Sequence, residues 1–531
     1  MQRQALVLSF EALQAELAGL RAAGKTIVQC HGVFDLVHIG HIRHFEEASR
    51  MGDVLVVTVT PDRYVNKGPG RPAFPEELRA EAVAALGMVD YVAVNRWPQA
   101  TEAIRALRPN VYVKGEEYRA AENDRTGGIV LEERAVQEVG GRIAFTGGLT
   151  SSSSALLNRH MPVLPREATD YLSDFAGRWS TEEVLQYLDE AGRLKVLVLG
   201  ETIIDDYHYC ESMGKTGKEP ILATRFVSSE RFAGGVLAVA NHIASFAGSV
   251  RLLSALGAAS SEEPFVREHL HPRVAPTFVY MEDAPTIVKR RFVETYPLQK
   301  LFEVYHMQEG TGANGYHREL CTHLAAALRE ADVVVVNDYG HGLLNAEAID
   351  LLCREAKFLA VNTQVNAANH GFNTVSKYPR AHYVAVSEAE LRLDARNRRG
   401  PLTDIVRDTA ARMGCRNFVV TQGQKGALCY SQTDGFRQIP AFTGRIVDRV
   451  GAGDAVFAVT ALCVAQGAPI EVAGVIGNAV GAQAVMTVGN REPIDRVKLS
   501  KHLTALLRQP ASMHARSGVR HEFRQRYRIS A

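Results

Sequence analysis

Short apolar runs alternate with amphipathic stretches along most of the chain. Runs such as 26–30, 54–60 and 195–200 are rich in apolar and β-branched residues, which is typical of strands buried on both faces. The stretch 38–48, which follows the first run, carries apolar residues at helical spacing. Strands that alternate with helices indicate a parallel sheet covered by helices. We therefore predict an α/β protein with doubly wound domains.

The alternation is interrupted once, and this interruption divides the chain. Its 531 residues are enough for two or three domains. We predict a first domain over 1–160, a linker over 161–192, a second domain over 193–508 and a basic tail over 509–531. The linker is marked by two prolines and by a short helix for which Ser180 is the expected N-cap.

Composition narrows the class of protein. Lys and Arg total 60 against 59 for Asp and Glu, so the net charge of +1 favours neither nucleic acid nor a membrane surface as a partner. The seven cysteines form no Cys-x-x-Cys pair, which indicates neither a disulfide framework nor a zinc site and fits a reducing cytoplasm.

Two further stretches bear on targeting. Residues 1–20 lack a basic start followed by a long apolar core, so we predict a leading amphipathic helix and no signal peptide. The apolar region 454–489 is interrupted by Gln466, Pro469 and Glu471, which favours buried helices over a membrane span.

The stretch 31–41, HGVFDLVHIGH, joins a predicted strand to a predicted helix. Such a turn directs backbone N–H groups and the positive end of the helix toward an anion such as phosphate. His38 and His41 fall on one face of the first helical turn, where each can donate a hydrogen bond, and Gly40 permits close approach of a nucleotide. A single histidine here would be a cap or an exposed polar group, whereas two after this turn favour phosphate binding.

This stretch resembles the GxFDxxHxGH motif of the cytidylyltransferase-like nucleotidyltransferases. The resemblance implies that His38 and His41 stabilise charge on the attacked α-phosphate, without a covalent nucleophile. Other segments resemble the same family: the Gly- and Pro-rich loop 61–75 resembles its KGxGRP segment, and SSSALL its Ser-Thr-Thr segment. The candidates for contact with nucleotide or substrate in this domain are Gly32, Phe34, Gly40, Lys67, Arg79, Lys114, Ser152, Ser153 and Ser154, with Lys67 assigned to the triphosphate.

The stretch 448–467 carries the second motif, DRVGAGD followed by an apolar helical run. Gly451, Ala452 and Gly453 permit a turn whose N–H groups point into one concavity, and Asp454 can take a proton from a substrate hydroxyl. The motif resembles the D-x-x-GAGD motif of the ribokinase-like carbohydrate kinases, and the resemblance extends over most of 195–500.

Further segments of the second domain resemble that family. They imply that Asp205, Gly234 and Gly235 face the sugar, that Thr421, Gly423 and Gly426 face the nucleotide, and that Glu390 acts indirectly on magnesium. Lys289 and Arg291 share one face of a predicted strand and could hold the substrate's terminal phosphate, although a solvated strand face is the alternative.

Departures from the kinase pattern leave the sugar open. Ala238 replaces a usual Asn, the residues 361–364 (VNTQ) replace Asp-Pro-Lys, Ser387 replaces Asn, and Asp206 replaces an Arg. These changes surround the expected sugar pocket and metal side, whereas the DRVGAGD segment is intact.

Together the two halves resemble, in reversed order, the bifunctional heptose 7-phosphate kinases and heptose 1-phosphate adenylyltransferases that make ADP-heptose, a lipopolysaccharide precursor. The resemblance implies ATP as substrate, Mg²⁺ as cofactor, small-molecule partners and a possible homodimer. One alternative is the same architecture acting on another sugar or polyol phosphate, or using CTP. The other is a nucleotidyltransferase whose kinase-like half is a binding module.

Overall fold

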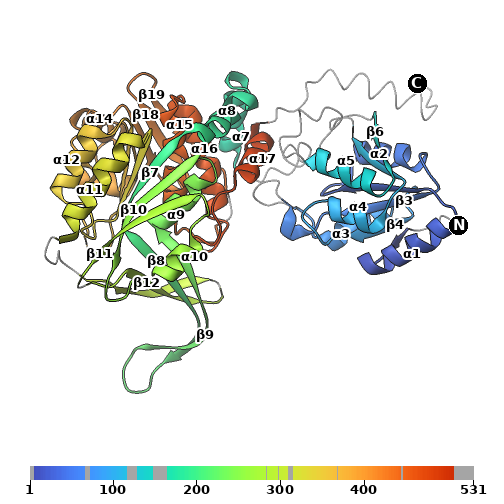
Figure 1. Cartoon of the computed structure of the whole chain (residues 1–531), viewed down its shortest axis with the longest axis horizontal. Coiled ribbons are helices and arrows are strands. Elements are labelled where there is room, and N and C mark those ends of the chain that lie inside the picture. The colour runs from blue at the N-terminus through green and yellow to red at the C-terminus, as the bar shows by residue number, and fades with distance from the viewer. Residues whose placement is uncertain are drawn as a thin grey trace. The chain divides into compact units, whose positions relative to one another are not determined.

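A computed structural model describes residues 5–65, 72–115, 128–147, 164–282, 284–296, 298–308, 315–367, 369–443 and 446–507. The chain forms two compact units, one within Met1–Val163 and one over Leu164–Leu503 (Figure 1). The predicted site residues Lys67, Ser152, Ser153 and Ser154 lie outside the described residues.

The first unit is built on a parallel six-stranded sheet of order β1-β4-β3-β2-β5-β6. Its strands are β1 (Leu6–Val7), β2 (Ile27–Gly32), β3 (Val54–Val59), β4 (Tyr91–Val94), β5 (Val111–Gly115) and β6 (Arg142–Thr146). Its helices are α1 (Phe10–Ala22), α2 (Ile39–Ser49), α3 (Glu76–Ala84), α4 (Thr101–Leu107) and α5 (Gly128–Glu138). The chain winds from β2 through β3 to β4 on one side and then crosses to β5 on the other. The carboxyl end of β2 is therefore a topological switch point, where ligands bind in open α/β sheets.

The prediction of a helix over 1–20 is wrong at its start. Leu6 and Val7 instead pair with Tyr91 and Val92 as the edge strand β1. The helix α1 begins only after Ser9, whose side chain accepts a hydrogen bond from the Ala12 amide at 3.2 Å and so caps the helix.

The second unit contains a nine-stranded sheet of order β11-β10-β7-β14-β15-β16-β17-β18-β19, which is parallel except at β18 and β19. Its strands are β7 (Lys195–Gly200), β10 (Ser249–Gly257), β11 (Val274–Met281), β14 (Val333–Asp338), β15 (Leu359–Thr363), β16 (Tyr383–Ser387), β17 (Asn417–Thr421), β18 (Ala427–Ser431) and β19 (Gly435–Ile439). The helices of this unit are α7 (Arg166–Arg178), α8 (Thr181–Glu190), α9 (Val236–Ala244), α10 (Glu263–His269), α11 (Gly315–Glu330), α12 (Ala346–Glu355), α13 (Glu388–Asp394), α14 (Leu402–Arg412), α15 (Ala452–Ala465), α16 (Ile470–Ala484) and α17 (Arg496–Leu507), whose last residues lie beyond Leu503.

A separate four-stranded sheet of order β13-β12-β8-β9 belongs to the same unit. It consists of β8 (Thr202–Lys215), β9 (Leu222–Gly235), β12 (Ile287–Glu294) and β13 (Gln299–His306). The long β8–β9 hairpin extends beyond the body of the unit in Figure 1.

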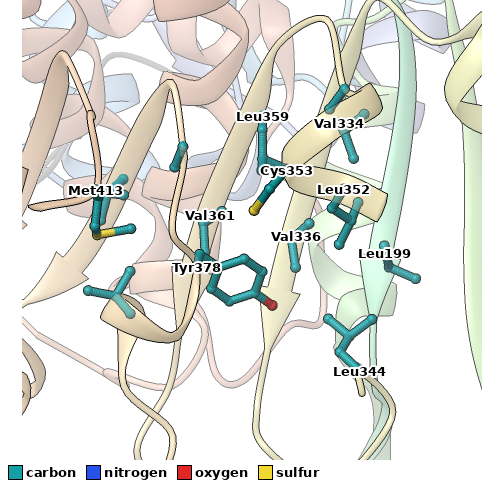
Figure 2. Packing of buried hydrophobic residues seen from close by; sticks show 14 of the residues in the cluster. Leu199, Val334, Val336, Leu344, Leu352, Cys353, Leu359, Val361, Tyr378 and Met413 are labelled. Atoms are coloured by element: carbon teal, nitrogen blue, oxygen red, sulfur yellow. The ribbon is translucent and has the colours of Figure 1, made fainter. Parts of the chain in front are cut away.

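The core of the large sheet explains its continuous apolar strands. Val334, Val336 and Val361 are buried against Leu352 of α12, so these strands are covered by helices (Figure 2). Tyr378 is also buried there, and its hydroxyl donates a hydrogen bond to the Asp338 carboxylate at the carboxyl end of β14. The core thus connects directly to polar groups at the edge where ligands bind.

The interval predicted as a linker forms two helices of the second unit. Ser180 caps α8 and forms a capping box with Glu183, as its sequence position suggests. In α7, Tyr171 and Arg178 both donate to the carboxylate of Glu471 on α16, at 2.9 Å for the phenol and 2.6 and 2.9 Å for the guanidinium. The structural division therefore falls between residues 163 and 164.

The apolar region 454–489 forms buried helices, α15 and α16, as predicted. Among the residues that the structure describes, no helix combines the length and apolar character needed to cross a membrane.

Candidate active sites

The histidine pair lies at the start of α2, directly beyond β2. His38 is the N-cap of α2, and its Nδ1 accepts a hydrogen bond from the Gly40 amide at 3.0 Å. Because Nδ1 accepts, the neutral ring carries its proton on Nε2, which can donate to a phosphate. The His38 and His41 rings stack at 4.0 Å between centroids, and the edge of Phe34 packs on His41 at 5.2 Å. The two predicted histidines are thus brought together.

The turn that carries this pair is tightly packed. Phe34 adopts a left-handed backbone conformation with φ of +50°, and a Cβ on Gly32 would lie 2.8 Å from the Phe34 ring. The neighbouring His31 bonds the Thr58 and Thr60 hydroxyls at 3.0 and 3.2 Å. Burial lowers the pKa of His31 to about 3, so this ring stays neutral. His31 is a structural residue below the site.

Arg79 contacts protein groups instead of standing open to a ligand. It is buried, and its guanidinium donates to the carbonyls of Val33, Phe74 and Thr60, the last two at 2.9 and 2.8 Å, and to the Asp62 carboxylate. These acceptors lie on the loops after β2 and β3 and before α3. Arg79 therefore holds these three loops together.

Lys114, another predicted substrate contact, is the penultimate residue of β5 and forms a largely buried ion pair with Glu132 of α5 at 2.7 Å. A ligand reaching Lys114 would have to share it with this carboxylate.

The second predicted turn lies at the start of α15 in the second unit. Gly451 has φ of +80°, and a Cβ there would lie 2.0 Å from the Asn490 side-chain oxygen. Asp448 fixes the turn, because its carboxylate accepts from the Tyr207 hydroxyl at 2.8 Å, from the Gly489 amide at 3.0 Å and from Lys300. The first N–H groups of a helix lack acceptors within that helix. At α15 the Ala452 amide donates to the Arg449 carbonyl at 3.4 Å, so the amides that follow it are the ones that can bind an anion.

Asp454 is 6% exposed in the first turn of α15 and is surrounded by neutral donors. Asn337 and Gln364 donate side-chain amide N–H groups to one carboxylate oxygen, and the Tyr339 hydroxyl donates to the other at 3.0 Å. Burial raises the pKa of Asp454 to about 6, although the bonds from Asn337 and Tyr339 oppose this. A carboxyl group with this pKa suits a general base near neutral pH.

The predicted sugar-facing residues meet where β8, β9 and β12 run together. A Cβ on Gly234 would lie 2.3 Å from an Asp205 carboxylate oxygen, so a larger residue there would displace Asp205. Asp205 pairs with Arg291 of β12, and Lys289, two residues earlier, lies over the Tyr339 ring at 5.5 Å. Since Tyr339 contacts Asp454, the sugar-facing groups and the carboxylate base share one site. Gly235, with φ of +56°, starts α9 beside it.

The predicted nucleotide segment forms the turn between β17 and β18. Thr421 ends β17, and Gly423 and Gly426 adopt φ of +59° and +85°. Glu390 lies nearby on α13, where its carboxylate accepts from Ser387 at 2.8 Å and from the Val365 amide at 3.1 Å. Glu390 thus holds the backbone next to Gln364, and both of its oxygens already have protein donors.

The chain was compared with models of known protein families. A model described as pfkB family carbohydrate kinase matches residues 193–496, more than half of the chain. The chain belongs to the pfkB family. A cytidylyltransferase-like model matches residues 30–157. The predictions of the fold, of the two domain families and of a transferase enzyme are therefore confirmed.

Individual relatives are similar over shorter stretches. The chain is 38% identical to the bifunctional protein HldE of Desulfatibacillum aliphaticivorans over 153 residues, which is 28% of this chain and 30% of that protein. It is 35% identical to HldE of Pseudomonas entomophila over 155 residues, 28% of this chain and 31% of that one. The alignments thus span under a third of these relatives' length. The solved phosphofructokinase-2 of Escherichia coli in complex with potassium is 19% identical, with a TM-score of 0.47, over 60% of this chain and 99% of that one.

Sequence reasoning missed the residues that surround the base of this pfkB family member. Asn337, Tyr339 and Gln364 come from β14 and from the segments after β14 and β15, and only the parallel sheet brings them to Asp454. A signal was present for Gln364, because the segment 361–364 (VNTQ) that contains it departs from the kinase pattern. Glu303 of β13, which pairs with Arg291, carried no motif and could not be found from the sequence.

Proposed function

We propose that this chain is a bifunctional enzyme, a sugar-phosphate kinase joined to a sugar 1-phosphate nucleotidyltransferase, and that it makes ADP-heptose. The observation that supports the kinase reaction best is Asp454, a nearly buried carboxylate in the first turn of a helix entered through a glycine turn. Base and anion-binding amides on one turn are what phosphoryl transfer to a hydroxyl requires.

In the kinase reaction, the acceptor hydroxyl gives its proton to Asp454 while its oxygen bonds to the γ-phosphorus of ATP. The bond from that phosphorus to the bridging oxygen breaks, and ADP leaves with its electron pair. The amides at the start of α15 hold the negative charge that moves onto the phosphate oxygens. Asn337, Tyr339 and Gln364 orient the carboxylate toward the acceptor.

In the nucleotidyltransferase reaction, the sugar 1-phosphate attacks the α-phosphorus of ATP, and pyrophosphate leaves. His38 and His41 donate hydrogen bonds to the α-phosphate, where negative charge accumulates. Arg79 keeps the three surrounding loops in register. Lys67, Ser152, Ser153 and Ser154 remain predicted phosphate contacts, and Lys114 a predicted substrate contact.

A magnesium ion bound with the nucleotide would neutralise charge on the phosphates. Glu390 is the carboxylate that we assign to its side of the kinase site. Because both Glu390 oxygens accept protein hydrogen bonds, contact through water fits this residue better than direct ligation.

ATP and sugar phosphates are cytoplasmic metabolites, and we place the enzyme in the cytoplasm. Its seven cysteines, all of them free and buried, are compatible with a reducing compartment. We propose small-molecule partners for both sites and leave a homodimer as a prediction.

The test uses the full chain with heptose 7-phosphate or heptose 1-phosphate and with ATP or CTP in parallel. Asp454→Asn should lower the formation of ADP from ATP with heptose 7-phosphate as acceptor by about 10³-fold, and should leave the release of pyrophosphate from ATP with heptose 1-phosphate as acceptor unchanged. His41→Ala should do the reverse, with a loss of about 10²-fold or more. Kinase turnover that survives in Asp454→Asn would refute the base assignment. Turnover with another sugar phosphate, or with CTP and not ATP, would change the proposed substrate and leave the two proposed reaction types standing.

A further inference from the structure

Two buried cations project from one face of β12 toward the sugar-facing site. Lys289 and Arg291 alternate with outward-facing residues along the strand, and both are under a tenth exposed. In the parallel pair with β8, Lys289 lies opposite Asp205 and Arg291 opposite Tyr207 (β8 and β12 in Figure 1). Sequence reasoning treated the two cations as equivalent phosphate contacts, but their surroundings differ.

Arg291 is already paired on two sides. Its guanidinium donates to Asp205 on β8 and, through Nε, to Glu303 on β13 at 2.9 Å. Glu303 lies directly opposite Arg291 in the antiparallel pair of β12 and β13, and its second oxygen accepts the Tyr305 hydroxyl at 2.7 Å. Two carboxylates around one guanidinium leave this group with a net negative charge, which repels an anion.

Lys289 interacts with the carboxylates of Asp205 and Glu303 only at longer range. Among the described residues, none forms an ion pair or a hydrogen bond with its ammonium group; instead the rings of Tyr305 and Tyr339 face it at 5.0 and 5.5 Å. A buried cation without a direct ion pair is costly, so an anion supplied by a ligand would be bound strongly there. The Tyr339 hydroxyl also contacts Asp454, which places this ammonium one ring away from the proposed base.

We propose that Glu303 determines acceptor specificity: by engaging Arg291 together with Asp205, it leaves Lys289 as the one receptor in this group for an anionic substituent of the acceptor. The pocket then fits a polyhydroxylated acceptor with a single phosphate, whose hydroxyls donate to Asp205 and Glu303. A second anionic group would meet these carboxylates. This inference rests on the proposed sugar-phosphate kinase function, and Glu303 acts in it as a positioning residue, through Arg291.

The experiment measures binding and turnover of the full chain with heptose 7-phosphate and mannose 6-phosphate, their unphosphorylated parents, and 6-phosphomannonate, which adds a carboxylate. The wild-type chain should bind each monophosphate about 30-fold more tightly than its parent and should bind 6-phosphomannonate poorly. Lys289→Met should remove the preference for the monophosphates and change the affinity for the parents less than 3-fold. Glu303→Gln should keep the preference and strengthen binding of 6-phosphomannonate about 10-fold, because it removes the net negative charge around Arg291, which stays paired with Asp205.

Glu211→Gln is the matched control, since Glu211 forms an exposed cross-strand pair with Arg225 in the same sheet, and it should change none of these ratios. A merely structural role of Glu303 would predict a uniform loss of affinity, not a gain for one ligand. Lys289→Met that keeps the preference, or Glu303→Gln that gains nothing for 6-phosphomannonate, would overturn the inference. A chain that shows these ratios but transfers no phosphate would refute the proposed kinase reaction and leave the inference intact. Equal binding of parents and phosphates in the wild-type chain would refute the inference alone.

Discussion

The starts of α2 and α15 use the same backbone device for two reactions. In both, a glycine-containing turn precedes a helix whose start favours phosphate, although at α2 the Gly40 amide already donates to His38 Nδ1. At α2 the side chains on the first turn are two stacked imidazoles, which can donate protons or hydrogen bonds to a phosphate. At α15 the side chain is a carboxylate held by neutral donors, which can accept a proton. In the proposed reactions the helix start binds the phosphate, and the side chain on it selects the chemistry.

Of the substitutions that distinguish the two sites, Gly451→Ala should have the largest effect. A Cβ at Gly451 would collide with Asn490 at 2.0 Å, in a backbone conformation of φ +80° that favours glycine. We expect kinase turnover to fall at least 100-fold, because the anion-binding turn cannot keep its shape, and nucleotidyl transfer to stay unchanged.

Gly467→Ala is the control for that change, because Gly467 has the same φ of +80° but nothing within 4 Å of a Cβ. It should cost about 1 kcal/mol of stability and little activity. Equal losses of kinase turnover in the two variants, measured as ADP formation, would show that strain and not the anion turn is responsible.

The pH dependence should distinguish the two sites next most strongly. Asp454 accepts a proton only when ionised, and burial raises its pKa to about 6. Kinase turnover should therefore fall about tenfold per pH unit below about 6 and level off above it. The pH profile of pyrophosphate release should not contain the step that is due to the Asp454 carboxyl. The test compares the pH profiles of ADP formation and pyrophosphate release in the wild-type chain with those in Asp454→Asn.

Tyr339→Phe tests the assignment of Asp454 as the base and should have a smaller effect on kinase turnover than the changes above. It removes one hydrogen bond to the ionised Asp454 and keeps the ring that faces Lys289. The pKa of Asp454 should rise, because a hydrogen bond that favours its charged form is lost. Kinase turnover should therefore fall about 10-fold at pH 6.5 and less at pH 8.5. Tyr280→Phe, which removes an exposed hydroxyl bonded to Glu263, should leave the profile unmoved.

The smallest effect on activity should come from Arg178→Ala. Arg178 donates to the nearly buried Glu471 carboxylate and holds α7 on the second unit. Its loss should lower the free energy of unfolding of this unit by about 1–3 kcal/mol while changing both turnovers less than 3-fold. Urea unfolding of Arg166→Ala, which removes an exposed pair with Asp170, gives the reference, and an equally small loss in both variants would contradict this role for α7.

The sequence by itself determined the two α/β domains, both helix-start turns and the candidate base. These features are local: apolar runs, glycine spacing and capping residues act on neighbours in the chain, so they can be read from a short stretch. The interval 161–192, predicted as a linker, contains α7 and α8, and Tyr171 and Arg178 of α7 bond Glu471, which lies some 300 residues away along the chain.

Only the tertiary structure decided which polar groups surround each site. Asn337 and Gln364 reach Asp454, and Glu303 reaches Arg291, because strands and segments distant in sequence end side by side at one sheet edge or pair across a small sheet. Arg79 was a predicted nucleotide contact, but in the structure it is buried and donates to the carbonyls of Val33 and Thr60, which lie on other loops. A hydrogen-bond partner is chosen by proximity in space, and no pattern along the chain records that proximity when the partners lie on different strands.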